Sequence, residues 1–136
     1  MTLTTKSALE TKKLGEKLSK RFTKGVVVCL RGELGAGKTT FIQGVAKGLK
    51  IKKRINSPTF IIARRYDNFW HIDLYRLTSY KEAYAIGIEE IINDKTSVVL
   101  IEWPEKIKKI LPKKRWEINI EIISANKRKI TYETIS

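Results

Sequence analysis

The sequence predicts an α/β protein, with a mostly parallel sheet flanked by helices and an antiparallel hairpin at the C-terminal edge of the sheet. Three observations predict this class. The runs from Val26 to Leu30 and from Ser97 to Ile101 are almost entirely apolar, as expected of strands buried on both faces. Helical patterns alternate with these runs. Beyond Arg115 apolar and polar residues alternate, which is typical of a strand with one exposed face.

The N-terminal third predicts a helix, a strand and a second helix. Ser7 and Glu10 form a capping box, and apolar residues then recur at four-residue spacing, so a helix is expected from about Ala8 to Phe22. Gly25 ends this segment, and the Val26 to Leu30 strand follows. A second helix of about three turns is expected after the next glycines. Its apolar face is formed by Phe41, Ile42, Val45 and Leu49.

The remainder predicts short strands and short helices. Two strands, Phe60 to Arg64 and Trp70 to Leu74, are expected around a turn at Asp67-Asn68. A second capping box at Ser79 and Glu82 begins a helix that Gly87 interrupts. Pro104 is typical of the first turn of another short helix, which Pro112 ends. The tail is expected to form a hairpin that turns near Ala125-Asn126.

Size and composition favour one compact domain over residues 1–136, since the chain has 136 residues of which 42% are hydrophobic. No apolar run reaches the roughly 20 residues that span a bilayer, and the first residues lack the apolar stretch of a secretory signal. We therefore expect a cytoplasmic protein without a membrane segment. The single cysteine, Cys29, excludes a disulfide framework or a cysteine zinc cluster and is interpreted as a core residue.

The net charge of +14, from 28 basic and 14 acidic side chains, raises the possibility of a polyanionic partner such as RNA. Most of the basic residues are dispersed lysines, which a solvated surface explains. Two groups are denser: Lys50 to Arg54 and Lys106 to Arg115. For each group two interpretations stay open, a solvated face or a contact with phosphates or an acidic partner.

A glycine-rich segment joins the Val26 to Leu30 strand to the helix that follows. It runs from Gly32 to Thr39 and satisfies the complete P-loop pattern, so the fold is expected to be of the P-loop NTPase type. Peptide N–H groups of such a loop and the positive end of the helix dipole bind phosphate oxygens. We expect nucleotide contacts from Glu33, Leu34, Gly35, Ala36, Gly37, Lys38, Thr39 and Thr40. Lys38 should bind the β and γ phosphates, and the Thr39 hydroxyl should bind Mg²⁺.

Two carboxylates follow expected strands at the edge where ligands gather. Glu102 comes directly after the Ser97 to Ile101 run and is the first candidate for a second Mg²⁺ ligand. Asp73 is the second candidate, as a residue that orients water or holds a metal-bound water. The alternative for each is a structural carboxylate. A guanine-reading Asn-Lys-x-Asp pattern begins at Asn126 but has Lys129 in the acidic position, so ATP is the expected nucleotide.

Together these motifs resemble the TsaE (YjeE) family of small P-loop ATPases in bacterial tRNA threonylcarbamoyladenosine synthesis. The resemblance covers nearly the whole chain. Besides the P-loop it rests on four segments: Ser57-Pro58-Thr59-Phe60, His71 to Leu77, Gly87-Ile88-Glu89-Glu90 and Ile101-Glu102-Trp103-Pro104-Glu105. A shorter match is Leu14-Gly15-Glu16.

The resemblance implies roles for individual residues and for partners. Lys38, Asp73 and Glu102 would be catalytic, with Thr39 and Glu102 as metal ligands and ATP and Mg²⁺ as the bound groups. Thr59 would sense the γ-phosphate, Thr11 would lie near the adenine, and Trp103 would be either a reporter to a partner or a core residue. The implied partners are the threonylcarbamoyl transferase subunit (TsaD-like) and its inactive paralogue (TsaB-like), with tRNA contact through that complex. Turnover by the isolated chain should be slow, because no arginine finger is evident unless Arg64, Arg65 or Arg76 supplies it.

Two rival functions stay open. A small-molecule kinase would use the same loop, but little chain is left for an acceptor pocket and a lid. A non-enzymatic RNA-binding module would use the lysine-rich surface and hold a nucleotide only as a structural ligand.

Overall fold

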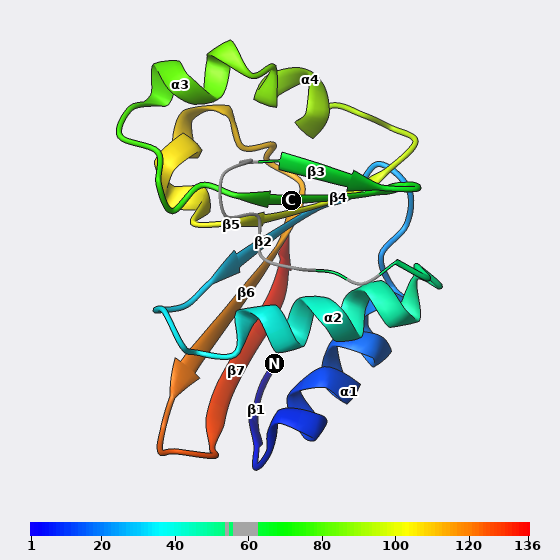
Figure 1. Cartoon of the computed structure of the whole chain (residues 1–136), viewed down its shortest axis with the longest axis vertical. Coiled ribbons are helices and arrows are strands. Elements are labelled where there is room, and N and C mark those ends of the chain that lie inside the picture. The colour runs from blue at the N-terminus through cyan, green and yellow to red at the C-terminus, as the bar shows by residue number, and fades with distance from the viewer. Residues whose placement is uncertain (54, 56–62) are drawn as a thin grey trace.

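The computed structural model describes residues 1–53, 55 and 63–136, and within them one mixed seven-stranded sheet has the order β1-β7-β6-β2-β5-β4-β3. The strands are β1 (Thr2–Thr5), β2 (Val27–Arg31), β3 (Ala63–Tyr66), β4 (Phe69–Asp73), β5 (Val98–Glu102), β6 (Arg115–Ile122) and β7 (Arg128–Ile135). The helices are α1 (Ala8–Ser19), α2 (Lys38–Gly48), α3 (Tyr80–Ala85), α4 (Ile88–Ile92) and the 3₁₀ helix η1 (Pro104–Ile110). Figure 1 shows these elements along the chain.

The centre of the sheet is parallel, which confirms the predicted fold class. Strands β6, β2, β5 and β4 run parallel, whereas β3 pairs antiparallel with β4, and β7 pairs antiparallel with β6 and β1. Strand β1 was not predicted. Its sequence, Thr2 to Thr5, has no apolar alternation and becomes a strand through its pairing with β7. The strand predicted over Phe60 to Arg64 begins at Ala63 in the described residues, and its first three positions lie outside them.

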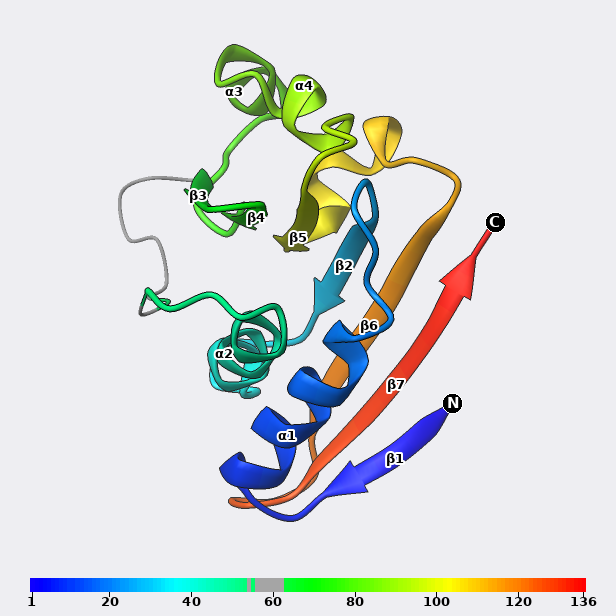
Figure 2. The ribbon, with the colours of Figure 1, turned by 90° about the vertical axis from the view of Figure 1, so that its right-hand side faces the viewer.

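Helices cover the two faces unequally. Helices α1 and α2 lie along one face, while α3, α4 and η1 lie on the other (Figure 2). The first face holds a core that includes Leu30, Phe41 and Ile118, and the second holds Cys29, Ile72 and Ile101. On the second face, side chains of β6 such as Glu117 and Asn119 stay only partly buried, so coverage there is incomplete. Helix α1 ends at Ser19 rather than at Phe22, although Phe22 is still buried.

Cys29 lies in β2 and is fully buried, which confirms its interpretation as a core residue. Burial, followed by the nearby charge of Glu117, raises the pKa of its thiol to about 12.

No helix in the described part of the chain is long and apolar enough to cross a bilayer.

The contact between α1 and α2 depends on glycines, of which Gly15 and Gly44 meet the partner helix's backbone most closely. A Cβ atom at Gly44 would lie 1.9 Å from the carbonyl oxygen of Lys12, and a Cβ at Gly15 would lie 2.3 Å from that of Phe41. Both obstacles are backbone atoms, so no side-chain rotation relieves them. The helices therefore approach closely because neither glycine has a side chain, and this contact sets where α2 lies on the sheet.

Helix α2 ends in a Schellman turn whose left-handed position is occupied by Lys50 instead of glycine. Lys50 has φ 64°, and the Ile51 N–H donates to the Ala46 carbonyl over 2.9 Å. A left-handed conformation costs a residue with a Cβ roughly 1 to 2 kcal/mol. Replacing Lys50 with glycine should therefore raise the free energy of unfolding by about 1 kcal/mol, measured by urea denaturation. Lys52→Gly is the control and should give no gain; an equal gain in both variants would contradict the strain at Lys50.

Candidate functional site

The glycine-rich loop lies between β2 and α2, as its sequence predicts. Gly37 is the N-cap residue of α2 and has φ 96°, a left-handed conformation that favours glycine. No side chain caps this end of the helix. The first N–H groups of α2 and its positive dipole end therefore remain available to an anion.

The amino group of Lys38 is buried and lacks a hydrogen-bond partner within the described residues. Its side chain is 6% exposed, and its Nζ atom lies 3.9 Å from Glu102 Oε1 and 4.2 Å from the centre of the Trp103 ring. Burial lowers the pKa of Lys38, while the charge of Glu102 opposes this shift. A buried ammonium group without hydrogen bonds is unfavourable, so its position fits a site that binds phosphate oxygens.

Glu102 ends β5 and faces Lys38 from the same side of the sheet. Its Oε2 atom lies 2.7 Å from His71 Nε2, while His71 Nδ1 lacks a partner in the described structure. This bond assigns the proton to Nε2, and it orients the carboxylate so that Oε1 faces Lys38. His71 was identified in the sequence only as part of a motif. Its contact with Glu102 was not predicted, because the two residues lie on different strands, 31 positions apart.

Asp73 lies directly beside Glu102. The register of β4 and β5 pairs these two residues, so the carboxyl ends of the two strands lie side by side. Asp73 Oδ1 accepts a hydrogen bond of 3.0 Å from the Tyr75 N–H. Burial raises the pKa of Asp73, and the charge of Glu102 raises it further. A carboxyl group with a raised pKa is better suited to accept a proton than an ordinary aspartate is.

Trp103 follows Glu102 in the sequence, and its ring forms part of the site wall beside the Lys38 amino group. It has φ 59° and ψ 48°, a left-handed conformation that is strained for a residue with a side chain. Its ring packs against Tyr75, with 5.2 Å between the ring centres. Trp103 is half-buried, so it belongs to the wall of the site as well as to the edge of the core.

These residues surround a cavity of about 280 Å³, here called the phosphate cavity. Its lining consists of Leu34, Gly35, Gly37, Lys38, Thr39, Asp73, Tyr75, Glu102 and Trp103. Thr39 supplies a hydroxyl and Glu102 a carboxylate, which is the small set of oxygen donors that Mg²⁺ uses beside phosphate. No cluster of three or more His, Cys, Asp or Glu side chains forms a metal site within the described ranges.

A second cavity, of about 220 Å³, adjoins the loop on its other side. It is lined by Ser7, Ala8, Thr11, Gly35, Gly37, Thr40, Ala125, Asn126 and Arg128. Thr11 and Thr40 therefore lie here rather than in the phosphate cavity. The hydroxyl of Thr11 lies 2.7 Å from that of Thr5. Gly35 and Gly37 line both cavities, so the two cavities adjoin the same part of the loop.

Two of the predicted residues, Glu33 and Ala36, do not line the phosphate cavity. Glu33 is exposed and lines a different hollow beside Arg31 and Glu121, while Ala36 is buried under the loop. Thr59 lies outside the described residues. Arg64, Arg65 and Arg76 are exposed and are not among the described residues that line the phosphate cavity.

Arg128 is a contact of the loop that the sequence did not predict. Its guanidinium donates to the carbonyl oxygens of Ala36 over 2.9 Å and Gly35 over 3.3 Å. It also donates to the carbonyls of Ser124 and Lys127 in the β6–β7 turn. Arg128 therefore ties the glycine-rich loop to the hairpin. No local pattern indicates this, because Arg128 and Ala36 are 92 positions apart.

Comparison with known proteins gives consistent matches. Residues 5–130 match the family model described as threonylcarbamoyl adenosine biosynthesis protein TsaE. A protein of Treponema pallidum named tRNA threonylcarbamoyladenosine biosynthesis protein TsaE is 36% identical over 134 residues, covering 96% of this chain and 98% of the relative. A Rickettsia felis protein of the same name is 42% identical over 124 residues, covering 88% and 71%. The crystal structure of Bacillus subtilis YdiB has a TM-score of 0.82 and 31% identity, covering 100% of this chain and 86% of that one.

Proposed function

Because the chain belongs to the TsaE family, which takes part in tRNA threonylcarbamoyladenosine biosynthesis, we propose that it binds and hydrolyses ATP in that pathway with Mg²⁺. The observation that supports this most directly is the buried amino group of Lys38. It faces the phosphate cavity between the open N-terminus of α2 and the carboxylate of Glu102. A triphosphate would supply the oxygens that the ammonium group and the loop N–H groups lack.

Each residue of the cavity has a definite task in this proposal. Lys38 binds the terminal phosphates, and the N–H groups of the loop bind the phosphate oxygens around it. Bound Mg²⁺ would neutralise the charge of the phosphate oxygens, held by Thr39 and Glu102. His71 keeps the Glu102 carboxylate in place through its 2.7 Å hydrogen bond.

Asp73 is proposed to orient the attacking water and accept its proton, or else to hold a metal-bound water. Its raised pKa, which burial and the neighbouring Glu102 cause, supports the first role. An arginine that stabilises the transition state is missing from the described lining of the phosphate cavity. We therefore infer that the isolated chain turns over slowly and that a partner completes the site.

The proposed partners are the threonylcarbamoyl transferase subunit, TsaD-like, and its TsaB-like inactive paralogue. The family's role in tRNA modification supports this assignment. We propose that the protein acts in the cytoplasm and that tRNA is brought near it through the complex. The nucleoside of ATP is proposed to occupy the second cavity, beside Thr11 and Thr40.

The test follows the γ-phosphate. Purified protein is titrated calorimetrically with Mg·ATP, and γ-labelled ATP is then incubated with the protein, alone and with the transferase subunit and its paralogue. We expect Mg²⁺-dependent binding and labelled inorganic phosphate, released faster with the partners. Label on a small molecule would identify a kinase instead. If the protein neither bound nor hydrolysed Mg·ATP, alone or with these partners, the proposal would be wrong.

Removal of the Arg128 side chain should weaken nucleotide binding without blocking folding. Arg128→Ala leaves the carbonyls of Gly35 and Ala36 without their donor and frees the loop from the hairpin. Hydrogen bonds to a charged group contribute about 1.5 to 3 kcal/mol, so the Kd for Mg·ATP should rise at least about tenfold by calorimetry. Lys129→Ala, an exposed neighbour, is the control. An unchanged Kd in Arg128→Ala would show that the loop holds its shape without this residue.

A further inference from the structure

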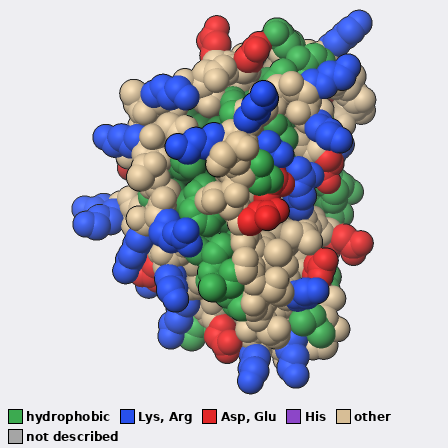
Figure 3. All heavy atoms as spheres, turned by 180° about the vertical axis from the view of Figure 1, so that it is seen from behind, with side chains coloured by type: hydrophobic (Ala, Val, Ile, Leu, Met, Phe, Trp, Pro, Cys, Tyr) green, Lys and Arg blue, Asp and Glu red, His purple; other side chains and the backbone are tan. Residues whose placement is uncertain are grey.

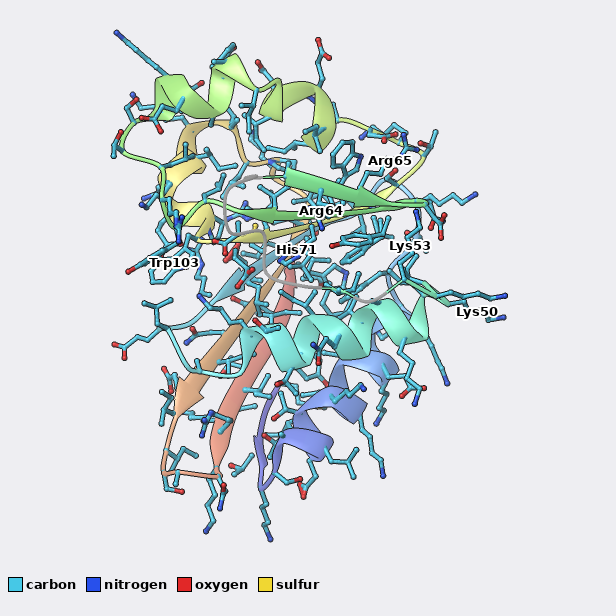
Figure 4. All side chains as sticks on the ribbon, viewed as in Figure 1. Lys50, Lys53, Arg64, Arg65, His71 and Trp103 are labelled. Atoms are coloured by element: carbon cyan, nitrogen blue, oxygen red, sulfur yellow. The ribbon has the colours of Figure 1, made fainter. Side chains whose placement is uncertain are left out.

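A concave surface at the C-terminal end of α2 concentrates positive charge. This lysine groove, of about 630 Å³, is lined by Lys12, Gln43, Ala46, Lys47, Lys50, Ile51, Lys52, Lys53 and Ile55. Five of these nine residues are lysines, and the part of the lining that the structure describes includes no carboxylate. Figure 4 shows Lys50 and Lys53 at this end of α2, whereas Trp103 lies near the opposite end. Seen from behind, basic side chains predominate along the corresponding, left-hand edge of the molecule (Figure 3).

The charges of the groove are not neutralised within the described part of the chain. Lys12, Lys50, Lys52 and Lys53 form no ion pair there. Lys47 lies 4.0 Å from Glu16, but both side chains are exposed, and such surface pairs contribute little. The C-terminal dipole of α2 accounts for one or two cations at this end. It does not account for five, because its effect fades beyond the last turn.

The conformation of Lys50 also indicates a use for its side chain. Lys50 occupies a left-handed position at which glycine would be more stable, so its presence lowers stability. Strained residues of this kind are found most often at functional sites. Here the residue supplies one of the cations of the groove.

The second lysine-rich segment of the sequence differs from the groove. Lys106 donates to the carbonyls of Tyr75 and Leu77, and Arg115 pairs with Glu117 at 2.8 Å. Lys106 and Arg115 therefore hold parts of the fold together, whereas Lys108 and Lys109 of this segment are exposed. The structure therefore separates two segments that look alike in the sequence, because only the segment after α2 combines with α1 and α2 into a concave surface.

We propose that the lysine groove binds the phosphate backbone of RNA. Lysines that neutralise successive phosphates supply most of the affinity of sequence-independent nucleic-acid binding. An acidic protein surface is the less suitable occupant, because protein interfaces are depleted in lysine, whereas lysine is the main residue type in the described lining of the groove. The groove and the phosphate cavity share no lining residue, so this inference goes beyond the proposed ATP chemistry.

The test measures binding of a fluorescently labelled tRNA transcript by anisotropy, without nucleotide, over a range of salt concentrations. The groove variant is Lys50→Gly/Lys53→Ala, in which the glycine should stabilise the fold. The control is Lys108→Ala/Lys109→Ala, which removes two exposed lysines of η1 on the other face of the sheet. We expect the groove variant to bind about tenfold more weakly at about 0.1 M salt. Its slope of log affinity against log salt should be shallower by about 1.5.

Three other results for tRNA binding would contradict the proposal. Equal loss of tRNA affinity in both variants would show that binding depends on net charge and not on the groove. If the unmodified chain showed no salt-dependent tRNA binding, the groove would not be an RNA site. Unchanged tRNA binding with lost association to the transferase complex would identify a protein occupant instead. Phosphate release from ATP is measured in parallel and should be unchanged in the groove variant. If the unmodified chain released no phosphate from ATP, that result would count against the ATPase proposal and not against RNA binding by the groove.

Discussion

Lys38→Ala should reduce the rate of ATP hydrolysis at least about a hundredfold while the protein remains folded. The Lys38 amino group is buried at the end of the cavity where the terminal phosphates are proposed to bind, and a preorganised donor of this kind contributes roughly 100- to 1,000-fold to a rate. The fold should tolerate the change, because it removes a buried cation that lacks a hydrogen bond within the described residues.

The measurement is phosphate release with the transferase subunit and its paralogue present, together with urea denaturation of each variant. Lys47→Ala is the matched control, since it removes an exposed lysine from the same helix. Its rate should equal that of the unmodified chain. If Lys38→Ala hydrolysed ATP within about threefold of normal, Lys38 would not bind the transferred phosphate, and the assignment of the cavity would be wrong.

Gly44→Val should lower the free energy of unfolding by about 3 kcal/mol and weaken nucleotide binding as well. A Cβ at position 44 would overlap the backbone of Lys12, so α1 and α2 must separate. Overpacking a well-packed contact costs about 1 to 3 kcal/mol, and valine adds two further methyl groups to the obstruction. Because α2 carries Lys38 and Thr39 at its first two positions, its displacement also moves the phosphate cavity.

Urea denaturation and calorimetric titration with Mg·ATP test this prediction. Gln43→Ala, one position earlier on the same helix, is the control and should change stability by less than about 1 kcal/mol. A Gly44→Val protein of normal stability would show that the two helices can separate without cost. Normal nucleotide binding in a destabilised variant would show that the loop does not depend on the position of α2.

The parts of the site that the sequence predicts are those governed by local patterns. The P-loop pattern lies in consecutive residues, and Glu102 and Asp73 each follow a strand, so the rule that ligands gather at strand ends brings them together. The pairing of β4 with β5 confirms that placement. Their chemical roles remain predictions.

What the sequence did not predict depends on contacts between distant segments. Arg128 meets the loop only after the hairpin folds against it, and His71 meets Glu102 only across two strands. The local sequence likewise does not predict the glycine contact between α1 and α2. A single glycine within a helical pattern usually lowers the stability of the helix and does not by itself indicate close packing. The parallel pair β2 and β5 was predictable because both strands are apolar on both faces, whereas β1 was not.

The pairing of β1 with β7 has a consequence for how the chain folds during synthesis. Thr2 lies opposite Thr131, so β1 leaves the ribosome well before β7 and finds its neighbour only after β7 has been made. Contacts between such distant positions form slowly, because a long chain must first be brought together. We therefore expect the nascent protein to form its parallel centre early and to carry β1 unpaired until β7 emerges, an interval in which a chaperone that binds extended segments could protect it.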